Sequence, residues 1–347
     1  MPGIRARGEE IRRFLLESVD EHPAKATKMA GEKFNISRQT VNAHLSRLRA
    51  EGVFNKTGKT SNKRYGLRVL KDWDKTYPLE SGLTEDAAWD EVAPVVGELP
   101  ANVLSIWNTG FTEMFNNALE HSAGTYASVR VRKTAINTEV AVFDDRVGIF
   151  RKIQQALNLP SERHAILELS KGKFTTDPSN HSGERIFFTS RMFDKFDIRS
   201  GELYFTHQSS KELDWLIEDD RTGNGTAVWM KLDNASTPNP ADVYAKFSVD
   251  DYQFDKTVVP IKLAQFGSQR LVSRSQANRV LARISIFKVV ILDFTGVVEI
   301  GQAFADEIFR VFAAAHPEVK LDVVGANLDI TNMITRARGT RLADLMS

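Results

Sequence analysis

Cysteine is absent from this 347-residue sequence, and so is any long run of apolar residues. Without thiols the chain has no disulfides, no thiolate nucleophile and no cysteine-based zinc site. A membrane-spanning helix needs about 20 consecutive apolar residues, and no segment approaches that length. Residues 1–10 also lack the apolar core of a secretion signal. We therefore expect a cytoplasmic protein that makes no contact with a membrane.

Charge is spread unevenly along the chain, although the net charge is only +1. Residues 1–75 carry 17 Lys and Arg against 9 Asp and Glu, a net charge of +8, whereas the remainder carries 29 against 36. A basic N-terminal segment on an acidic remainder predicts that the segment meets a polyanion. The length predicts two or three domains. Turn-forming residues at 71–78 and 233–240 predict the joints between them.

The basic segment has the pattern of three short helices followed by a polar hairpin. Apolar spacing predicts helices at 9–19 and 24–34, and a third from Ser37, an N-cap residue, to Arg49. Residues 52–67 then predict a basic β-hairpin. The stretch from Asn35 to Leu48 resembles the recognition helices of bacterial transcription regulators. Together these elements resemble a winged helix-turn-helix.

This resemblance implies that the third helix enters the major groove of double-stranded DNA while the hairpin contacts the backbone. Gln, Asn and Arg side chains can pair with base edges, and Lys and Arg can neutralise phosphates. Winged helices also serve as protein-interaction modules, and that alternative stays open. The predicted DNA-binding residues are Ser37, Arg38, Gln39, Asn42 and Arg47 on the helix and Lys59, Lys63 and Arg64 on the hairpin.

A polar stripe marks the predicted helix from Glu113 to His121. Glu113, Asn117 and His121 recur every four residues, so their side chains share one helix face. A carboxylate and a carboxamide one turn apart suit an ATP site, where they activate a water and hold Mg²⁺. The alternative is an amphipathic helix with a solvated polar face.

Further motifs follow this helix in a fixed order. Alternating residues predict strands at 126–132 and 139–143, and a third strand at 227–232 follows Gly225 and Thr226. This order resembles the ATP-binding fold shared by DNA gyrase, heat-shock chaperone ATPases, sensor histidine kinases and MutL-type proteins, the GHKL superfamily. The resemblance covers about residues 80–235.

The GHKL resemblance implies a role for each matching residue. Glu113 would be the general base, and Asn117 would hold Mg²⁺. Asp144 would accept the adenine amino group, Gly148 would let the backbone approach the base, and Thr226 would close the site near the adenine.

The segment from Lys171 to Gly183 would form the ATP lid, and both ends would contact the nucleotide. Two positions depart from the family pattern, because Arg146 and Arg185 stand where glycines are usual. Glycine serves where the backbone takes a positive φ or approaches the ligand closely. The two arginines therefore predict impaired binding of ATP and Mg²⁺. The alternative is that the two guanidinium groups grip phosphates or another anion.

The C-terminal third alternates between strands and helices. Strands are predicted at 258–263, 287–294 and 321–324, and helices at 273–284, 303–315 and 330–336. This rhythm predicts a small α/β domain with right-handed crossovers. Residues 291–305 resemble the STAS domains of anti-sigma-factor antagonists, and specifically the STAS-like domain often found behind such an ATPase module.

STAS antagonists carry a phosphorylatable serine at the start of one helix. The matching stretch here, residues 301–303, has no side-chain hydroxyl group. Thr295 lies nearby and is an alternative acceptor of a phosphoryl group. We therefore expect this unit to serve in packing or dimerisation rather than phosphoryl transfer.

These observations predict an α+β multidomain protein with a winged helix-turn-helix at 1–71, a GHKL α/β sandwich at 78–236 and a STAS-like α/β domain at 245–345. We expect a DNA-binding transcription regulator that senses ATP or ADP. The expected partners are double-stranded DNA, a second copy of the chain and a protein bound through the STAS-like domain. One alternative is an ATPase or serine protein kinase resembling anti-sigma-factor kinases, and another is a scaffold.

Overall fold

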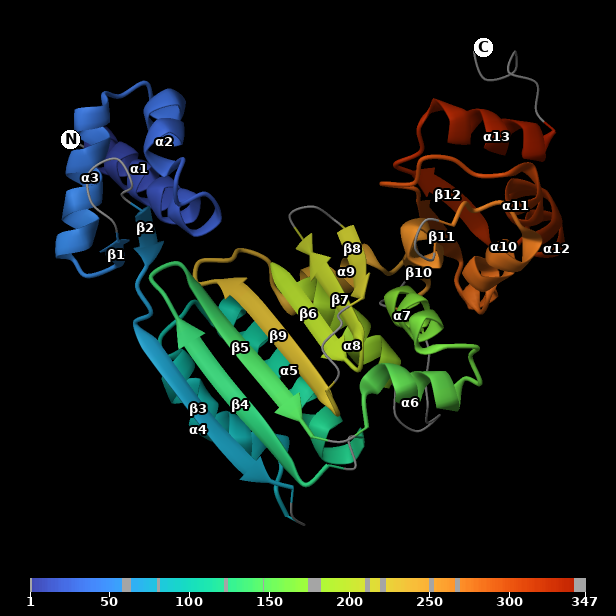
Figure 1. Cartoon of the computed structure of the whole chain (residues 1–347), viewed down its shortest axis with the longest axis horizontal. Coiled ribbons are helices and arrows are strands. Elements are labelled where there is room, and N and C mark those ends of the chain that lie inside the picture. The colour runs from blue at the N-terminus through green and yellow to red at the C-terminus, as the bar shows by residue number, and fades with distance from the viewer. Residues whose placement is uncertain are drawn as a thin grey trace.

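The fold is α+β and comprises three units (Figure 1). We call residues 2–67 the N-terminal unit, 71–249 the central unit and 253–339 the C-terminal unit. No helix in the described part of the chain is long and apolar enough to cross a bilayer. The computed structural model describes residues 2–57, 64–79, 82–121, 124–145, 147–173, 182–209, 213–218, 223–249, 253–265 and 269–339.

The N-terminal unit consists of three helices and a two-stranded antiparallel hairpin. Its core is its own, built around the fully buried Leu15, Val41 and Leu45. The predicted N-cap is confirmed, because Ser37 Oγ accepts a hydrogen bond from the Thr40 amide at 3.1 Å. The elements are α1 (Pro2–Glu21), α2 (Ala26–Phe34), α3 (Arg38–Ala50), β1 (Phe54–Thr57) and β2 (Arg64–Leu67).

The central unit is built on a seven-stranded antiparallel sheet with the strand order β3-β4-β5-β9-β6-β7-β8. The prediction of a joint at 71–78 is wrong, because these residues form the edge strand β3 and pair with β4 along their whole length. The strands are β3 (Lys71–Pro78), β4 (Tyr126–Lys133), β5 (Asn137–Asp144), β6 (Lys195–Ser200), β7 (Leu203–Gln208), β8 (Leu213–Glu218) and β9 (Thr226–Asp233).

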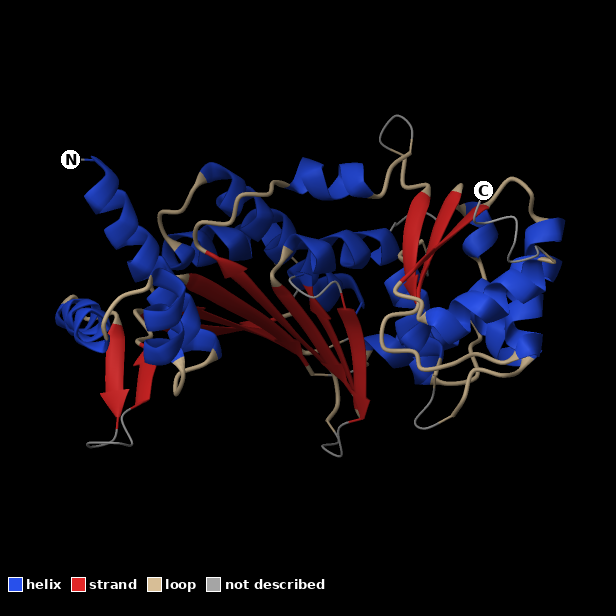
Figure 2. Cartoon of the chain, turned by 90° about the horizontal axis from the view of Figure 1, so that it is seen from above, coloured by secondary structure: helices blue, strands red, loops and turns tan. Residues whose placement is uncertain are grey.

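Helices lie along one side of this sheet, and no helix of the described residues lies along the other (Figure 2). α5 packs against the sheet through a continuous apolar stripe that includes Trp107, Phe111 and Phe115. A Cβ on Gly110 would lie 2.4 Å from the Phe193 ring, so only glycine allows this approach. The helices are α4 (Glu85–Val96), α5 (Ala101–Asn116), α6 (Ile149–Ala156), α7 (Glu162–Lys171), α8 (Ser182–Met192) and α9 (Pro240–Lys246).

The predicted helix at 113–121 is only the end of a longer one. α5 begins at Ala101 and passes at Asn117 into a π-helical turn, Asn117–His121. A π-turn has more residues per turn than an α-helix, so the four-residue spacing does not keep the later positions on the same face. Such turns occur frequently at functional sites.

The C-terminal unit contains the three-stranded parallel sheet β10-β11-β12, as its predicted strand–helix alternation requires. Its apolar core is continuous with that of the central unit, whereas the N-terminal unit forms a separate core. The elements are β10 (Lys256–Pro260), a 3₁₀ turn (Ile261–Ala264), α10 (Arg274–Leu281), a 3₁₀ turn (Ile284–Ile286), β11 (Val289–Asp293), α11 (Gln302–Asp306), a π-helical segment (Glu307–Phe312), α12 (Ala313–Ala315), β12 (Lys320–Val324) and α13 (Leu328–Arg338).

Candidate functional site

Two of the predicted adenine contacts meet where β5 ends and β9 begins. Asp144 is the last residue of β5, and Thr226 is the first of β9. The Thr226 amide donates to Asp144 Oδ1 at 3.1 Å, and the Ile149 amide donates to Thr226 Oγ1 at 3.1 Å. These bonds fix the backbone after β5 against the start of β9. Asp144 is half-buried and Thr226 is buried, so both side chains are held in a partly dry environment.

Two glycines let the backbone pack closely at this corner. Gly225 has φ +88°, and a Cβ there would lie 2.0 Å from the Asp144 carbonyl oxygen. A Cβ on Gly148 would lie 2.1 Å from Ser200 Oγ. Neither position accepts a side chain without a shift of its neighbours. The approach of the Gly148 backbone to an adenine base stays a prediction.

Ser200 is a residue of this corner that the sequence analysis missed. Its hydroxyl is buried and has no hydrogen-bond partner among the described residues. A buried hydroxyl without a partner is costly, so such an atom marks a place where a ligand or water can bind. A single serine at a strand end gives no signal in the sequence.

Glu113 and Asn117 lie one turn apart near the end of α5, and both are half-buried. Arg185, in the first turn of α8, places Nη1 3.4 Å from Glu113 Oε2. In α9, burial raises the pKa of the Tyr244 phenol, and the Glu113 carboxylate adds to the rise. The carboxylate predicted to be a general base therefore forms an ion pair.

The end of α5 and the Asp144 corner approach the same part of the sheet. The π-helical turn Asn117–His121 contacts β5, the strand that ends at Asp144. Asn117 Nδ2 lies 4.0 Å from Met114 Sδ, a weak contact within the helix. The structure thus gathers Asp144, Gly148 and Thr226 in one cluster, and brings Glu113 and Arg185 together in a second.

Lys171 does not belong to this site, and the prediction that it contacts the nucleotide from the lid is wrong. Its ammonium is buried between the central and C-terminal units. Nζ donates to Glu168 Oε1 at 2.8 Å and to the carbonyl oxygens of Arg279 at 3.0 Å and Ala282 at 2.8 Å. These acceptors satisfy all three N–H groups of an ammonium. Burial lowers the pKa of Lys171, while Glu168 acts in the opposite direction.

The remaining positions of the predicted lid are only partly described. Gly183 lies in the first turn of α8, which begins at Ser182. Arg146 and residues 174–181 lie outside the described residues.

The predicted DNA-binding residues of α3 lie on its solvent side. Arg38, Gln39, Asn42 and Arg47 are exposed, whereas Val41, Leu45 and Leu48 are buried in the N-terminal unit. Figure 1 shows α3 at the outer edge of that unit. Ser37 is exposed, and its hydroxyl is used as the helix cap. Lys59 and Lys63 lie outside the described residues, and only the backbone of Arg64 is described, in β2.

Acidic and histidine side chains form no metal site by themselves in the described part of the chain. Among the residues that the structure describes, no three or more His, Asp or Glu side chains form a group that could hold a metal ion. Any divalent cation near Asn117 would therefore need ligands from a bound molecule or from water.

Comparison with known protein families matches one part of the chain. Residues 276–331, from α10 into α13, match a family described as a STAS-like domain of unknown function (DUF4325). The C-terminal unit contains a STAS-like domain. In this domain the helix after β11 is capped by Gly301, where a Cβ would lie 2.8 Å from Val272 Cα. A serine could not occupy that cap without a shift of the backbone. A search of curated proteins found no match to the chain.

Proposed function

We propose that this chain is a DNA-binding transcription regulator whose central unit binds ATP or ADP, with Mg²⁺, in the manner of GHKL proteins. The observation that carries the proposal is the corner at which Asp144, Gly148 and Thr226 meet beside the end of α5. The N-terminal unit would be a winged helix-turn-helix, and the central unit a GHKL α/β sandwich.

The corner suits an adenine ring. A carboxylate such as Asp144 can accept a hydrogen bond from the adenine amino group, and partial burial strengthens that bond. Gly148 and Gly225 let the backbone pack closely against Ser200 and Asp144, which brings the strand ends together at this corner. Ser200 offers a further hydroxyl that has no partner among the described residues.

The other end of the site suits phosphates. The amide oxygen of Asn117 is a hard ligand of the kind Mg²⁺ prefers, with water and phosphate oxygens completing the shell. The N-terminus of α8 presents backbone N–H groups, which favour an anion. Arg185 adds a cation close to Glu113. Because this ion pair competes with proton abstraction by Glu113, we propose nucleotide sensing without rapid hydrolysis.

The DNA half of the proposal rests on the exposed face of α3. Gln39 and Asn42 can pair with base edges, and Arg38 and Arg47 with phosphates or guanine. Paired recognition helices would read a pseudo-palindromic site, so we propose that a homodimer binds double-stranded DNA. The STAS-like domain would contribute to pairing or would hold a protein partner.

The nucleotide half is tested by calorimetry with ATP and Mg²⁺. Asp144→Asn keeps an oxygen for the Thr226 amide but removes the charge, and we expect it to weaken binding about tenfold. Asp145→Asn is the matched control, because Asp145 instead accepts from the Thr125 amide at 2.8 Å and from the Thr125 hydroxyl. No heat of binding by the unchanged chain at millimolar ATP would remove the nucleotide function.

The DNA half is tested by gel shift at increasing salt with random double-stranded DNA. Affinity should fall steeply with salt, because bound phosphates release counterions. Arg38→Ala should reduce the slope of log affinity against log salt by about 1 if Arg38 contacts a phosphate. Glu32→Ala, an exposed change on α2, should not reduce it. Affinity independent of salt would favour the protein-interaction alternative.

A second candidate function is an enzyme, an ATPase or a serine protein kinase resembling anti-sigma-factor kinases. Its support is that Glu113 stands one turn before Asn117, as a base and a Mg²⁺ ligand would. The ion pair with Arg185 counts against it. Hydrolysis that is lost in Glu113→Gln would favour the enzyme over the sensor.

A further inference from the structure

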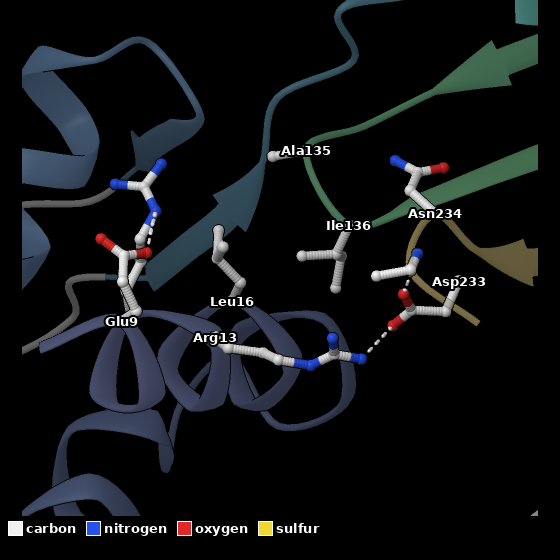
Figure 3. A pocket seen from close by; sticks show the side chains of 9 residues that line it. Glu9, Arg13, Leu16, Ala135, Ile136, Asp233 and Asn234 are labelled. Atoms are coloured by element: carbon white, nitrogen blue, oxygen red, sulfur yellow. Dashed lines mark hydrogen bonds and ion pairs between the residues drawn. The ribbon is translucent and has the colours of Figure 1, made fainter. Parts of the chain in front are cut away.

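The N-terminal unit meets the central unit through a small apolar contact. Leu16 of α1 faces Ala135 and Ile136, at the tip of the β4–β5 hairpin (Figure 3). The tip is also bonded to the segment after β9, because the Asn234 backbone N–H donates to the Ile136 carbonyl oxygen at 2.7 Å. The pocket left in this contact has a volume of about 170 Å³. Small-molecule sites occupy about 300–1,000 Å³, so this pocket is an imperfectly filled joint.

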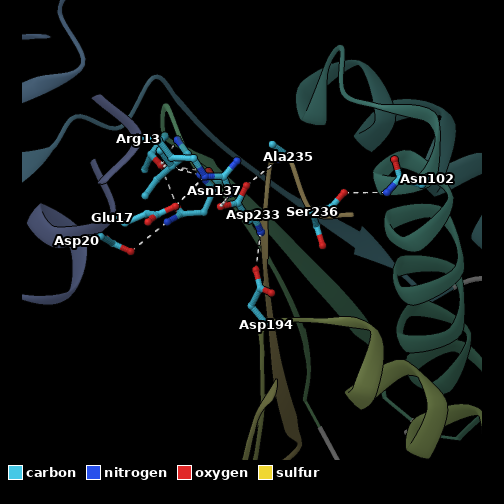
Figure 4. A network of polar contacts seen from close by, with 11 residues as sticks. Arg13, Glu17, Asp20, Asn102, Asn137, Asp194, Asp233, Ala235 and Ser236 are labelled. Atoms are coloured by element: carbon cyan, nitrogen blue, oxygen red, sulfur yellow. Dashed lines mark hydrogen bonds and ion pairs between the residues drawn. The ribbon is translucent and has the colours of Figure 1, made fainter. Parts of the chain in front are cut away.

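Polar side chains surround the apolar contact. Asp20 Oδ2 accepts hydrogen bonds from Asn137 Nδ2 at 3.1 Å and from Lys231 Nζ at 2.7 Å (Figure 4). Arg13 Nη2 donates to Asp233 Oδ2 at 3.1 Å. The Asp20, Lys231 and Arg13 side chains are 30%, 32% and 53% exposed. Ion pairs of this exposure are individually weak and are screened by salt.

The strands that end at this joint lead directly to the candidate nucleotide site. β5 begins at Asn137 and ends at Asp144, and β9 runs the other way from Thr226 to Asp233. The two strands are hydrogen-bonded neighbours in the sheet. Eight residues of strand span about 25 Å. A shift of the Asp144 corner therefore acts on the joint through a pair of stiff elements.

The helix that carries Glu113 is also tied to the joint. The Asp233 amide donates to Asp194 Oδ2 at 2.7 Å, and the residues after Asp233 turn toward α5. There Asn102 Nδ2 donates to the carbonyl oxygens of Ser236, Thr237 and Pro238 at 2.8–3.2 Å. The β5–β9 pair thus meets the N-terminal unit at its far end, and α5 is bonded to the segment that directly follows β9.

The C-terminal unit is attached in a different way. It shares the apolar core of the central unit, and the buried Lys171 joins the two. Small polar contacts between domains allow relative motion, whereas large apolar ones do not. Of the two flanking units, the N-terminal unit is therefore the one that can move.

We propose that the contacts among Arg13, Asp20, Asn137, Lys231 and Asp233 form a releasable clasp, through which the nucleotide site sets the orientation of the N-terminal unit. Asp20 is its central residue, because it is bonded to both strands. The role of the nucleotide rests on the proposed function, whereas the clasp itself does not.

Single-molecule fluorescence transfer tests the clasp, and the absence of cysteine makes labelling simple. One dye is attached at Lys28→Cys on α2 and the other at Asp90→Cys on α4, both exposed positions. Asp20→Lys should shift or broaden the transfer distribution, because it places a cation beside Lys231. Glu21→Lys is the matched control, with the same charge change at the next, exposed residue. Adding Lys231→Asp to Asp20→Lys should restore the original distribution.

An unchanged distribution in Asp20→Lys, with folding verified by circular dichroism, would overturn the clasp. The same measurement is then made on the unchanged chain with ATP and Mg²⁺, at concentrations for which calorimetry shows binding. A shift supports the coupling, and its absence with bound ATP overturns it. If calorimetry shows no ATP binding, the coupling falls together with the proposed function, and the Asp20→Lys comparison still decides the clasp.

Discussion

Arg185 is the residue whose contact most changes the expected chemistry of this chain. Its guanidinium lies against the Glu113 carboxylate, which the GHKL resemblance assigns as the general base. Under the proposed function, this contact would compete with proton abstraction by Glu113.

Arg185→Gly is expected to raise ATP hydrolysis about tenfold or more, a fraction of the 10²–10⁴-fold typical of general-base catalysis. Phosphate release under single-turnover conditions would measure it. Arg185→Lys keeps the cation and should stay close to the unchanged chain, and Glu113→Gln should cancel the gain. If Arg185→Gly binds ATP without any gain in rate, the ion pair does not restrain Glu113.

At the scale of elements, a buried charge cluster holds the edge strand β8 to its neighbours. Asp214 of β8 accepts from Arg191 Nη2 of α8 at 3.0 Å and lies 2.6 Å from His207 Nδ1 of β7. Burial alone would raise the pKa of Asp214, but Arg191 and His207 outweigh it and hold the pKa below its usual value of 3.8.

A lowered pKa in the folded state means that the ionised Asp214 stabilises the fold above about pH 4. This contribution is lost as the pH falls through the lowered pKa. Asp214→Asn should reduce the free energy of unfolding by about 3–5 kcal/mol at pH 7, since Arg191 loses a buried partner. Urea unfolding at pH 7 and at pH 3 would measure this difference. Between pH 7 and pH 3, the free energy of unfolding should fall less in the variant than in the unchanged chain. Asp306→Asn, which removes an exposed pair with Arg310, is the control.

Periodicity predicted most of the elements but not every edge. Strands β4 and β9 alternate between core and solvent, whereas β5 is buried along most of its length. The sequence placed all three strands within one or two residues. β3 was mistaken for a joint because it is rich in charge and ends at Pro78. β3 is held as a strand by its pairing with β4, and the Arg130 guanidinium of β4 donates hydrogen bonds to the Asp72 carboxylate of β3.

The site was predictable where its residues are close in sequence or follow a known order. Asp144, Gly148 and Thr226 do meet, as the order of motifs suggested. Lys171 was misplaced because its partners, the carbonyl oxygens of Arg279 and Ala282, come from more than 100 residues along the chain. The sequence around a lysine does not show whether its ammonium contacts a ligand or donates hydrogen bonds to carbonyl oxygens of a distant helix.

At the scale of the whole molecule, the residues that the structure describes form two hydrophobic cores rather than three. The central unit and the STAS-like domain share one, and Lys171 bonds the end of α10 from across their boundary. The N-terminal unit has the other. Units that share an apolar core unfold together, because unfolding of one unit exposes the apolar side chains of the other to water.

Calorimetric unfolding should therefore show two transitions, one for the N-terminal unit and one for the remainder. Lys171→Met leaves Glu168 buried without its cation, so it should lower the larger transition by about 10 °C and leave the smaller one in place. Three separate transitions, or equal shifts in both, would contradict this division of the chain.

The separate core of the N-terminal unit also has a practical consequence. A foreign domain could replace this unit through a graft at residues 68–70, where the backbone passes from β2 to β3. It would need to present an arginine, an aspartate and a leucine where Arg13, Asp20 and Leu16 now meet the central unit. Under the proposed function, such chimaeras would show whether the same central unit can set the orientation of a different DNA-binding unit.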